Sequence, residues 1–469
     1  MDQADAVTNS KPGLVKGLSL LDGTTLTMGS MIGSGVFIVA ADISRQVQSP
    51  GLMMLTWIVT AVLTLIAALS YGELSAAMPR AGGQYIYLRE AFGPLYGFLY
   101  GWTFFTVIQT GTIAAVAVAF AKFLGYFLPA VSTRNYLLQL GPFGLTTQMA
   151  VAIVVIVFLT WVNTRGLRTG AIVQNVFTIA KVGALAGLIA LGVFLGRRPE
   201  AIQANFTDFW RAPGSLWDVV RLTGVAMVGA LFSSDAWHSV TLAAGEIKNP
   251  KRDLPLSLAI GVGTVSILYL GCNLVYLMAL PLSGIMNAPE DRVATAVIAQ
   301  VLGPAATAIM AAAVMVSTFG CINGLVLSGA RVYYAMAEDG LFFQAVRRVD
   351  PVHHTPYVSL WVQCLWACLL TLTGRYNDLL DYVIFAVLLF YVLTIAGLFV
   401  LRRTQPGLER PYRAFGYPLL PAIYIAVAGG IEILLLIYKP SYTWPGLILV
   451  LIGVPVFLLW RGKGKRSEA

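Results

Sequence analysis

The chain has 469 residues, of which 58% are hydrophobic and only 11% are charged, and its formal net charge is +9. A soluble domain carries roughly 25% charged residues, so this composition excludes a water-soluble protein of this length. The positive charges lie in loops between apolar stretches. This pattern indicates contact with an anionic membrane surface rather than with nucleic acid.

Apolar windows of about 20 residues, the length that spans a bilayer, recur from Leu26 to Trp460. They predict an all-α membrane protein with twelve transmembrane helices. The predicted spans are 24–43, 52–78, 95–128, 148–163, 169–195, 217–242, 255–280, 304–337, 358–373, 379–401, 417–438 and 443–460.

The distribution of Lys and Arg predicts the orientation of these spans. Residues 1–17 are polar and lack the apolar core of a signal peptide. With the N-terminus inside, Lys and Arg favour the inner loops and tails by about two to one, although Arg197, Arg198 and Arg211 run against this trend. We therefore expect a multi-pass protein of the cytoplasmic (inner) membrane, with cytoplasmic tails at 1–17 and 461–469.

The first span contains an unusual glycine-rich stretch, Gly29-Ser-Met-Ile-Gly-Ser-Gly-Val-Phe37. Each glycine in a helix costs about 1 kcal/mol relative to alanine. Gly29 and Gly33 alone are also compatible with a GxxxG face for helix packing. The stretch therefore has two interpretations, a broken helix or a packing surface.

The sixth span favours the broken helix, because it is interrupted by Phe232-Ser-Ser-Asp-Ala-Trp237. Ser and Asp offer the backbone alternative hydrogen bonds, and a charge at the depth of Asp235 costs several kcal/mol unless it faces a cavity or a partner. Both interruptions fall near the bilayer midplane. We expect spans 1 and 6 to be discontinuous helices.

Span 6 also opens a second set of five spans, and an odd number of spans per half gives two halves of inverted topology. The predicted organisation is a first repeat at 18–196, an extracellular loop at 197–216, a second repeat at 217–401 and two further helices within 402–460. At the centre of such a repeat, free backbone amides can hold a carboxylate and free carbonyls can hold an ammonium group. Together they fit the two ends of an α-amino acid.

The residues expected to bind this substrate lie mostly in the two interruptions. They are Met31, Ile32, Gly33, Ser34, Gly35, Phe232, Ser233, Ser234, Asp235 and Asn323. Phe232 is placed to cap the substrate as a gate, with ordinary packing as the alternative. Asn323 could line the site or pack between helices.

Lys181 lies in the middle of span 5 among apolar residues, about a dozen residues from either end. Snorkelling to the interface is the alternative interpretation, but the distance makes it awkward. A buried ammonium group can replace a bound metal cation, so Lys181, together with Ser317 in span 8, is expected to couple transport without Na⁺ and with a role for protons.

Several other polar residues have less certain roles. Glu246 follows span 6 and is expected to be a charge of the inner gate, while Glu73 and Arg331 are structural or gating charges near the cytoplasmic ends. His238 lies at the rim of the site or packs. The four cysteines, Cys272, Cys321, Cys364 and Cys368, lie in apolar segments without companion histidines, so no disulfide, metal site or cofactor is expected.

Six segments together resemble the amino acid–polyamine–organocation superfamily, and in particular the bacterial relatives of its L-amino-acid transporters. The resemblance covers residues 18–438. The segments that carry it are GSMIGSGVF (29–37), YGELSAAMPRAGGQYIYLREAFG (71–93), the region of Lys181, FSSDAW with GEIKNPKRDLP (232–255), FGCINGLVLSGARVYYAMAEDG (319–340) and ERPYRAFGYP (409–418).

The resemblance implies the LeuT-type fold of five plus five inverted helices and alternating access. It also implies that Gly33–Gly35 take the substrate carboxylate, that Phe232 is an aromatic gate and that Lys181 stands where Na⁺ lies in sodium-coupled relatives. Animal relatives bind an accessory glycoprotein through a cysteine between spans 3 and 4. Residues 129–147 contain no cysteine, so this disulfide-linked partner is not expected.

The sequence departs from the family where Ser233-Ser-Asp-Ala236 replaces a frequent aromatic-Gly-Gly pattern. An acid at Asp235 favours cationic substrates without deciding for them. We expect a secondary transporter or exchanger of neutral L-amino acids, with cationic amino acids or polyamines as the alternative. An enzyme would need clustered catalytic side chains and a channel a ring of like groups, which the sequence lacks; an amino-acid sensor remains a remote alternative.

Overall fold

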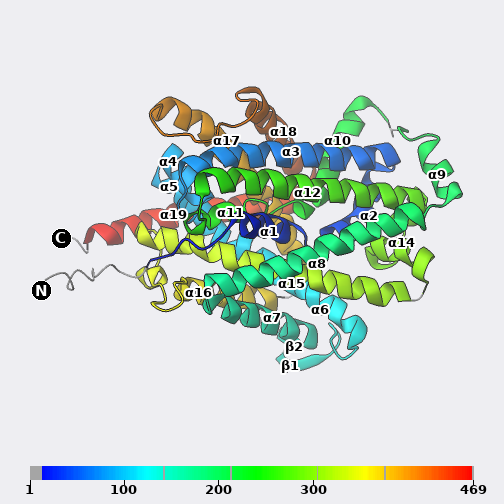
Figure 1. The fold of residues 1–469 in the computed structure, drawn as a ribbon, viewed down its shortest axis with the longest axis horizontal. Coiled ribbons are helices and arrows are strands. Elements are labelled where there is room, and N and C mark those ends of the chain that lie inside the picture. The colour runs from blue at the N-terminus through cyan, green and yellow to red at the C-terminus, as the bar shows by residue number, and fades with distance from the viewer. Residues whose placement is uncertain (1–12, 141–142, 212–213, 304, 374–375, 467–469) are drawn as a thin grey trace, which may run out of the picture.

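The computed structural model describes residues 13–140, 143–211, 214–303, 305–373 and 376–466. The described chain is an elongated bundle of helices, with both termini at the same end (Figure 1). Its only sheet within these ranges is a hairpin of β1 (Tyr136–Leu140) and β2 (Phe143–Thr146) between spans 3 and 4. Helices dominate because a lipid environment offers the backbone no other hydrogen-bond partners.

Ten helical segments of the described chain are long and apolar enough to cross a membrane. They are α3 (Pro50–Ala77), the continuous α5–η1–α6 segment (Pro94–Thr103, Phe104–Ile108, Gln109–Phe127), α7 (Thr147–Thr164), α8 (Leu167–Phe194), α10 (Leu216–Ser233), α12 (Pro250–Ala279), α15 (Ala305–Glu338), α17 (Tyr376–Thr404), α18 (Leu419–Tyr438) and α19 (Pro440–Arg466).

An eleventh span is the bent pair α1 (Leu20–Met31) and α2 (Gly35–Val47), whose axes differ by 42°. The ninth predicted span, 358–373, coincides with α16 (Tyr357–Leu372), which is apolar but has only 16 residues. The α-helical membrane fold is therefore confirmed, with ten or eleven helices of full spanning length in the described chain instead of twelve.

Both predicted helix interruptions are present. The helix α1 ends at Met31, and Ile32 has extended backbone angles before α2 begins at Gly35. The helix α10 ends at Ser233, and the chain resumes helical structure only in α11 (Ser239–Leu242) and the 3₁₀ turn η2 (Ala244–Glu246). Between them Ala236 adopts a φ of 61°, a left-handed conformation that an α-helix cannot contain.

Helices of the first half pack against their counterparts in the second half. Span 2 packs on span 7 (α3 with α12), span 3 on span 8 (α6 with α15) and span 4 on span 9 (α7 with α16), and α2 of span 1 packs on α10 of span 6. A pseudo-two-fold axis between two repeats requires such pairs near the axis. The packing therefore supports the inverted repeat, and the repeat boundaries at 18–196 and 217–401 remain a proposal.

Shorter elements occupy the connections. They are α4 (Gln84–Phe92), α9 (Pro199–Phe206), α13 (Leu282–Met286), η3 (Pro289–Asp291), α14 (Val293–Leu302) and η4 (Gln344–Arg347). The helix α19 continues to Arg466, beyond its apolar part Thr443–Trp460 and into the predicted tail 461–469, which stays a prediction. At the other end, Leu18 pairs with Ile247 in a parallel bridge, so the chain is already anchored just after the predicted tail 1–17.

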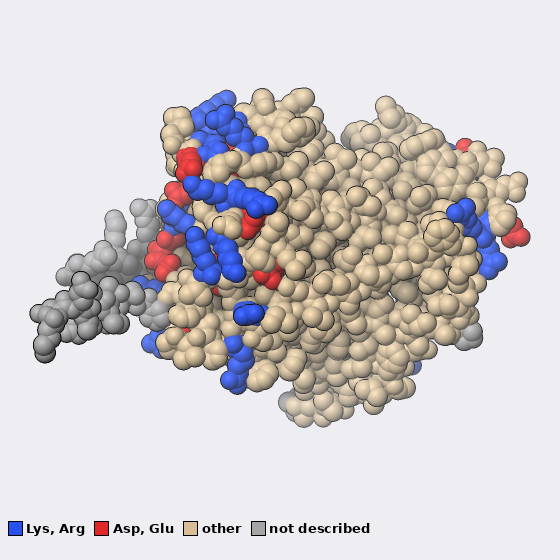
Figure 2. Space-filling view, in the orientation of Figure 1, with Lys and Arg blue, Asp and Glu red and all other residues tan. Residues whose placement is uncertain are grey.

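The molecular surface fits a membrane environment. Figure 2 shows charged side chains gathered at the end that carries the termini, a broad uncharged belt across the middle, and a smaller charged group at the opposite end. Large apolar side chains such as Val154, Ile267 and Leu459 are 65%, 72% and 73% exposed. A soluble protein would bury such a belt, so this chain is a multi-pass membrane protein.

Candidate functional site

The site is built around the break between α1 and α2, where the last carbonyl groups of α1 lose their helical partners. Lys181 of α8 replaces the missing hydrogen-bond donors for these carbonyls. Its ammonium Nζ donates to the carbonyl oxygens of Gly29 (2.6 Å), Ile32 (2.8 Å) and Ser317 (3.1 Å). The side chain is 1% exposed, and three carbonyls around one cation resemble the coordination of a metal ion.

Other side chains take the remaining carbonyls of this break. The Ser317 hydroxyl donates to Ile32 and Gly33 (3.1 and 2.8 Å), and the Cys321 thiol lies 3.1 Å from the carbonyl of Ser30. From α12, the Tyr269 hydroxyl lies 3.2 Å from the carbonyl of Met31. The structure thus joins Lys181 and Ser317, as predicted, but at carbonyls that could otherwise have held a substrate ammonium group.

The backbone amides at the start of α2 are hydrogen-bond donors, in contrast to the carbonyl acceptors at the end of α1. The first amides of any helix lack intrahelical acceptors, and the helix dipole places partial positive charge there. In α2 these amides belong to Ser34, Gly35 and Val36. Ser34 has no side-chain capping bond, so this helix end presents backbone donors without an internal acceptor.

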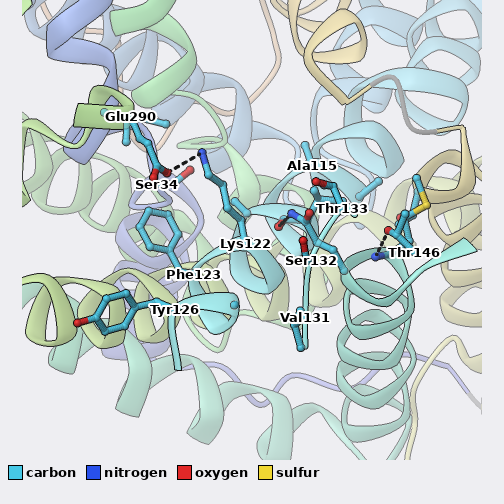
Figure 3. A pocket seen from close by; sticks show the side chains of 18 of the residues that line it. Ser34, Ala115, Lys122, Phe123, Tyr126, Val131, Ser132, Thr133, Thr146 and Glu290 are labelled. Atoms are coloured by element: carbon cyan, nitrogen blue, oxygen red, sulfur yellow. Dashed lines mark hydrogen bonds and ion pairs between the residues drawn. The ribbon is translucent and has the colours of Figure 1, made fainter. Parts of the chain in front are cut away.

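Ser34 also lines a cavity of about 1370 Å³, which we name the vestibule. Its wall comes from α2, α6, the β1–β2 region and the turn η3, as Figure 3 illustrates with Ser34, Phe123 and Thr146. Charges of both signs line it, including Asp42 and Lys122, the latter 4.0 Å from Glu290. The helix α2, which lines the vestibule, lies toward the end of the molecule away from the termini (Figure 1).

Gly35 is required where α2 approaches α10. A Cβ atom at Gly35 would lie 2.3 Å from the Ser233 Oγ and 3.1 Å from the Ser233 Cα. By contrast, a Cβ at Gly33 would meet only the Cys321 sulfur, at 3.7 Å. Gly35 therefore lets the two broken helices touch, and Ser233 faces α2 at the contact.

The second break directs its side chains away from the vestibule. Phe232 lines a separate cavity of about 170 Å³ between α2, α10, α17 and α18. Ser234 and Asp235 line a cavity of about 20 Å³ with Trp237 and Tyr391. In this conformation neither Phe232 nor Asp235 meets Ser34 in one cavity, so a shared contact with substrate stays a prediction.

Asn323 lies elsewhere in the bundle. Its carbonyl accepts from Asn163 (2.9 Å), and its amide donates to Gln174 (2.9 Å) and to the carbonyl of Gly170 (3.1 Å). The side chain is fully buried between α7, α8 and α15. These contacts correspond to the packing alternative, and binding of a ligand would require the bonds to be given up.

The end of the molecule near the termini is held by ion pairs. Glu246, predicted for the inner gate, is fully buried and binds Arg331 through both oxygens (2.7 and 3.1 Å). Its backbone carbonyl accepts from Gly17 and Leu18 (both 2.9 Å). This contact fastens the N-terminal segment across the end of span 6.

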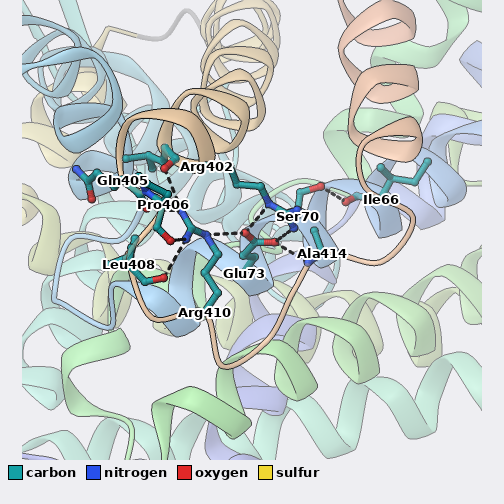
Figure 4. A network of polar contacts seen from close by, with 10 residues as sticks. Ile66, Ser70, Glu73, Arg402, Gln405, Pro406, Leu408, Arg410 and Ala414 are labelled. Carbon is teal, nitrogen blue, oxygen red and sulfur yellow. Dashed lines mark hydrogen bonds and ion pairs between the residues drawn. The ribbon is translucent and has the colours of Figure 1, made fainter.

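A second polar network lies on the inner end of α3 (Figure 4). The buried carboxylate of Glu73 binds Arg402 (2.6 and 2.9 Å), Arg410 (3.2 Å) and the amide of Ala414 (2.7 Å). It joins α3 to the loop between α17 and α18, which contains the segment ERPYRAFGYP. The two networks hold the helices together at this end of the molecule.

Three tyrosines of the site were not predicted from the sequence. Tyr269 bridges the carbonyls of Met31 and Ser233, and Tyr276 donates to Val36, so α12 binds both broken helices. Tyr391 of α17 binds Asp235 and His238. The spacing of seven between Tyr269 and Tyr276, on one face of a helix, was the available signal.

The described part of the chain contains no group of three or more His, Cys, Asp or Glu side chains that could hold a metal ion. The cysteines are free thiols, three buried and Cys368 partly exposed.

Two helices interrupted in mid-membrane, a deep vestibule on one side and a closed gate on the other define a secondary transporter of the LeuT type. The comparison with known families is more specific. Residues 18–457 match the amino acid permease family, and the chain belongs to that family, within the amino acid–polyamine–organocation superfamily.

Known relatives cover nearly the whole chain. The rat large neutral amino acids transporter small subunit 2 is 30% identical in an alignment of 468 positions that covers 96% of this chain and 82% of the relative. The human Asc-type amino acid transporter 1 is 28% identical over 97% of this chain and 85% of its own length. The mouse b(0,+)-type amino acid transporter 1 is 29% identical over 95% and 87%.

Proposed function

We propose that this chain is a secondary transporter, and not an enzyme, that moves neutral L-amino acids across the cytoplasmic membrane by alternating access. The observation that carries the proposal is the vestibule that ends at Ser34, where α2 presents unpaired amides. The substrate carboxylate binds the unpaired amides of Ser34, Gly35 and Val36, because a helix N-terminus is a ready-made anion site. The ammonium group binds the carbonyls of Ser234 and Asp235, which directly follow α10 and accept no hydrogen bond from the described residues.

The substrate ammonium group is assigned to the end of α10 because the last carbonyls of α1 already accept hydrogen bonds from side chains. Lys181, Ser317, Cys321 and Tyr269 already bind the last carbonyls of α1. The end of α10 lies within contact of the α2 amides through Gly35 and Ser233. The two ends of one zwitterion therefore fall on opposite sides of that helix contact.

Transport is independent of Na⁺ in this proposal. The ammonium of Lys181 fills the carbonyl cluster at Gly29, Ile32 and Ser317, which is the kind of site that a sodium ion would need. Replacement of Na⁺ by choline on both sides of the membrane is expected to leave leucine uptake unchanged. A loss of uptake in choline would remove Lys181 from the role of a built-in cation.

The orientation follows from the charges. The closed side, with Glu246, Arg331 and Glu73, faces the cytoplasm together with both termini, and the vestibule opens outward. The inner loops carry the larger share of Lys and Arg, in the sense of the positive-inside rule. No accessory subunit linked by a disulfide is proposed.

The choice of neutral substrates rests on relatives that are described as transporters of large neutral amino acids. Asp235 in the second break favours cationic amino acids or polyamines as the second candidate, because a carboxylate near the site can neutralise a cationic side chain. An amino-acid sensor with this fold would bind the same ligands without moving them.

Uptake into proteoliposomes separates these candidates. Radiolabelled leucine, alanine, serine, arginine and putrescine are tested with and without unlabelled amino acid inside. Uptake of leucine or alanine supports the proposal, and uptake of only arginine or putrescine supports the second candidate. A strict need for internal amino acid indicates exchange, and binding without uptake indicates a sensor.

A further inference from the structure

Three polar side chains form one hydrogen-bonded row beside the second helix break. The Tyr391 hydroxyl lies 2.6 Å from Asp235 Oδ1 and 2.8 Å from His238 Nδ1. Asp235 and His238 lie on either side of Ala236, whose left-handed conformation turns both toward α17. The row thus joins a carboxyl group to an imidazole through a single phenol.

Counting protons shows that this row has two arrangements. The phenol has one proton and can donate it to only one neighbour. If it donates to an ionised Asp235, His238 must donate from Nδ1. If it donates to His238, Asp235 must carry a proton on Oδ1. The histidine Nε2 makes no hydrogen bond to the described residues in either case, so it does not fix the tautomer.

The surroundings favour a proton on the row. Within the described residues, no Lys, Arg or His side chain forms an ion pair with Asp235, whose carboxyl group interacts with the Tyr391 hydroxyl and with the backbone amide of Ala236. The titratable groups near the row are the phenols of Tyr71 (α3), Tyr100 (α5) and Tyr424 (α18) and the thiol of Cys321 (α15). An ionised Asp235 would therefore be a partly buried charge without a counter-charge.

A small cavity touches the same carboxyl group. It measures about 20 Å³ and is lined by Asp235, Ser234, Tyr391, Thr64 and Tyr424. The rest of its wall is largely apolar, from Leu231, Trp237, Ile384, Val387 and Leu388. The cavity has room for about one water molecule. A water there can reach Oδ2 and exchange a proton with it.

We propose that Asp235, Tyr391 and His238 form the proton-binding site that couples amino-acid transport to a proton gradient. A proton from solvent binds Asp235 and makes the row neutral in the occluded state. It leaves on the cytoplasmic side after the break rearranges, and Tyr391 passes it toward His238. The proposal rests on the proposed transport function, and it assigns the coupling proton to α10 and α17 rather than to Lys181.

The experiment uses the full-length protein in proteoliposomes that contain a pH-sensitive dye. Leucine uptake and internal acidification are recorded together, and the readout is the number of protons per leucine. The wild type is expected to acidify the lumen in step with uptake. Asp235→Asn is expected to abolish the proton flux per leucine, and Tyr391→Phe to reduce it at least about fivefold, because the row is cut.

Glu432→Gln is the matched control. Glu432 is a second buried carboxylate in a span, on α18, and Oε1 of its side chain makes no hydrogen bond to the described residues. This variant is expected to keep the wild-type uptake and proton ratio. His238→Gln retains a hydrogen-bonding side chain that cannot carry the proton, and is expected to lower the number of protons moved per leucine.

The outcomes are distinct. Wild-type uptake without proton movement overturns the proton site but leaves the transport function intact. A proton ratio that persists in Asp235→Asn, or that is lost in Glu432→Gln or Lys181→Ala while Asp235→Asn retains it, also overturns the proposal. Absence of any amino-acid uptake by the wild type overturns the proposed function itself.

Discussion

At the scale of single residues, Lys181 is the side chain on which the first break depends most. Its ammonium group binds Gly29, Ile32 and Ser317, which belong to two different helices. A buried carbonyl without a donor costs about 1–3 kcal/mol. The lysine therefore stabilises the interrupted conformation of α1 as well as replacing a cation.

Replacing Lys181 by alanine is expected to lower leucine uptake about tenfold or more, because at least one buried carbonyl loses its donor and 1.4 kcal/mol corresponds to a factor of ten. Lys251→Ala is the control, since Lys251 is 58% exposed and pairs only with Glu409. Both variants are checked for folding by size-exclusion chromatography. Normal uptake by a well-folded Lys181→Ala protein would contradict this role.

The sequence alone located Lys181 and Ser317 because a charge in mid-membrane is costly wherever it faces. It did not locate Tyr269 or Tyr391. A tyrosine in an apolar helix is unremarkable, and the partners of these two lie 238 and 156 residues away along the chain. Asn323 shows the converse, since its polarity suggested a ligand whereas its partners are Asn163 and Gln174.

At the scale of elements, the contact between α2 and α10 brings the two broken helices together at Gly35 and Ser233. Their interruptions were predictable because Gly, Ser and Asp are weak in a helix core. The direction of each side chain after the break was not, since it depends on backbone angles such as that of Ala236. The hairpin β1–β2 was missed because the prediction treated 129–147 only as a loop.

Gly35→Ala is expected to destabilise this contact by about 1–3 kcal/mol, because the added methyl group would overlap Ser233. The expected result is a lower thermal unfolding temperature and slower uptake. Gly183→Ala on α8 is the control, because a Cβ there meets nothing within 4 Å. Equal behaviour of the two variants would show that α2 and α10 do not need to touch.

At the scale of the whole molecule, one end is open and the other is closed. The vestibule reaches Ser34 from the side away from the termini, while Glu246–Arg331 and Glu73–Arg402 hold the other end. Loss of one partner of a buried ion pair costs about 3–5 kcal/mol. A shift of about 5.5 kcal/mol takes a two-state equilibrium from 1:99 to 99:1, so these pairs can set which side is open.

Glu246→Gln is therefore expected to shift the protein away from the outward-open conformation. A Val118→Cys reporter in the vestibule wall measures this shift through labelling by a membrane-impermeant thiol reagent, which should slow severalfold. Labelling of the protein without the reporter is subtracted. Glu409→Gln, which breaks an exposed pair worth about 0–1 kcal/mol, should leave the rate unchanged, and an unchanged rate in Glu246→Gln would contradict the gate.

The N-terminal segment has a mechanical consequence for this cycle. Gly17 and Leu18 donate to the carbonyl of Glu246, and Lys248 donates back to Leu18, so backbone bonds stitch the start of α1 to the stretch after α11. The helix α1 and the segment after the second break must therefore move together as one rigid unit. A displacement of either one moves the other directly, without a contribution from the substrate.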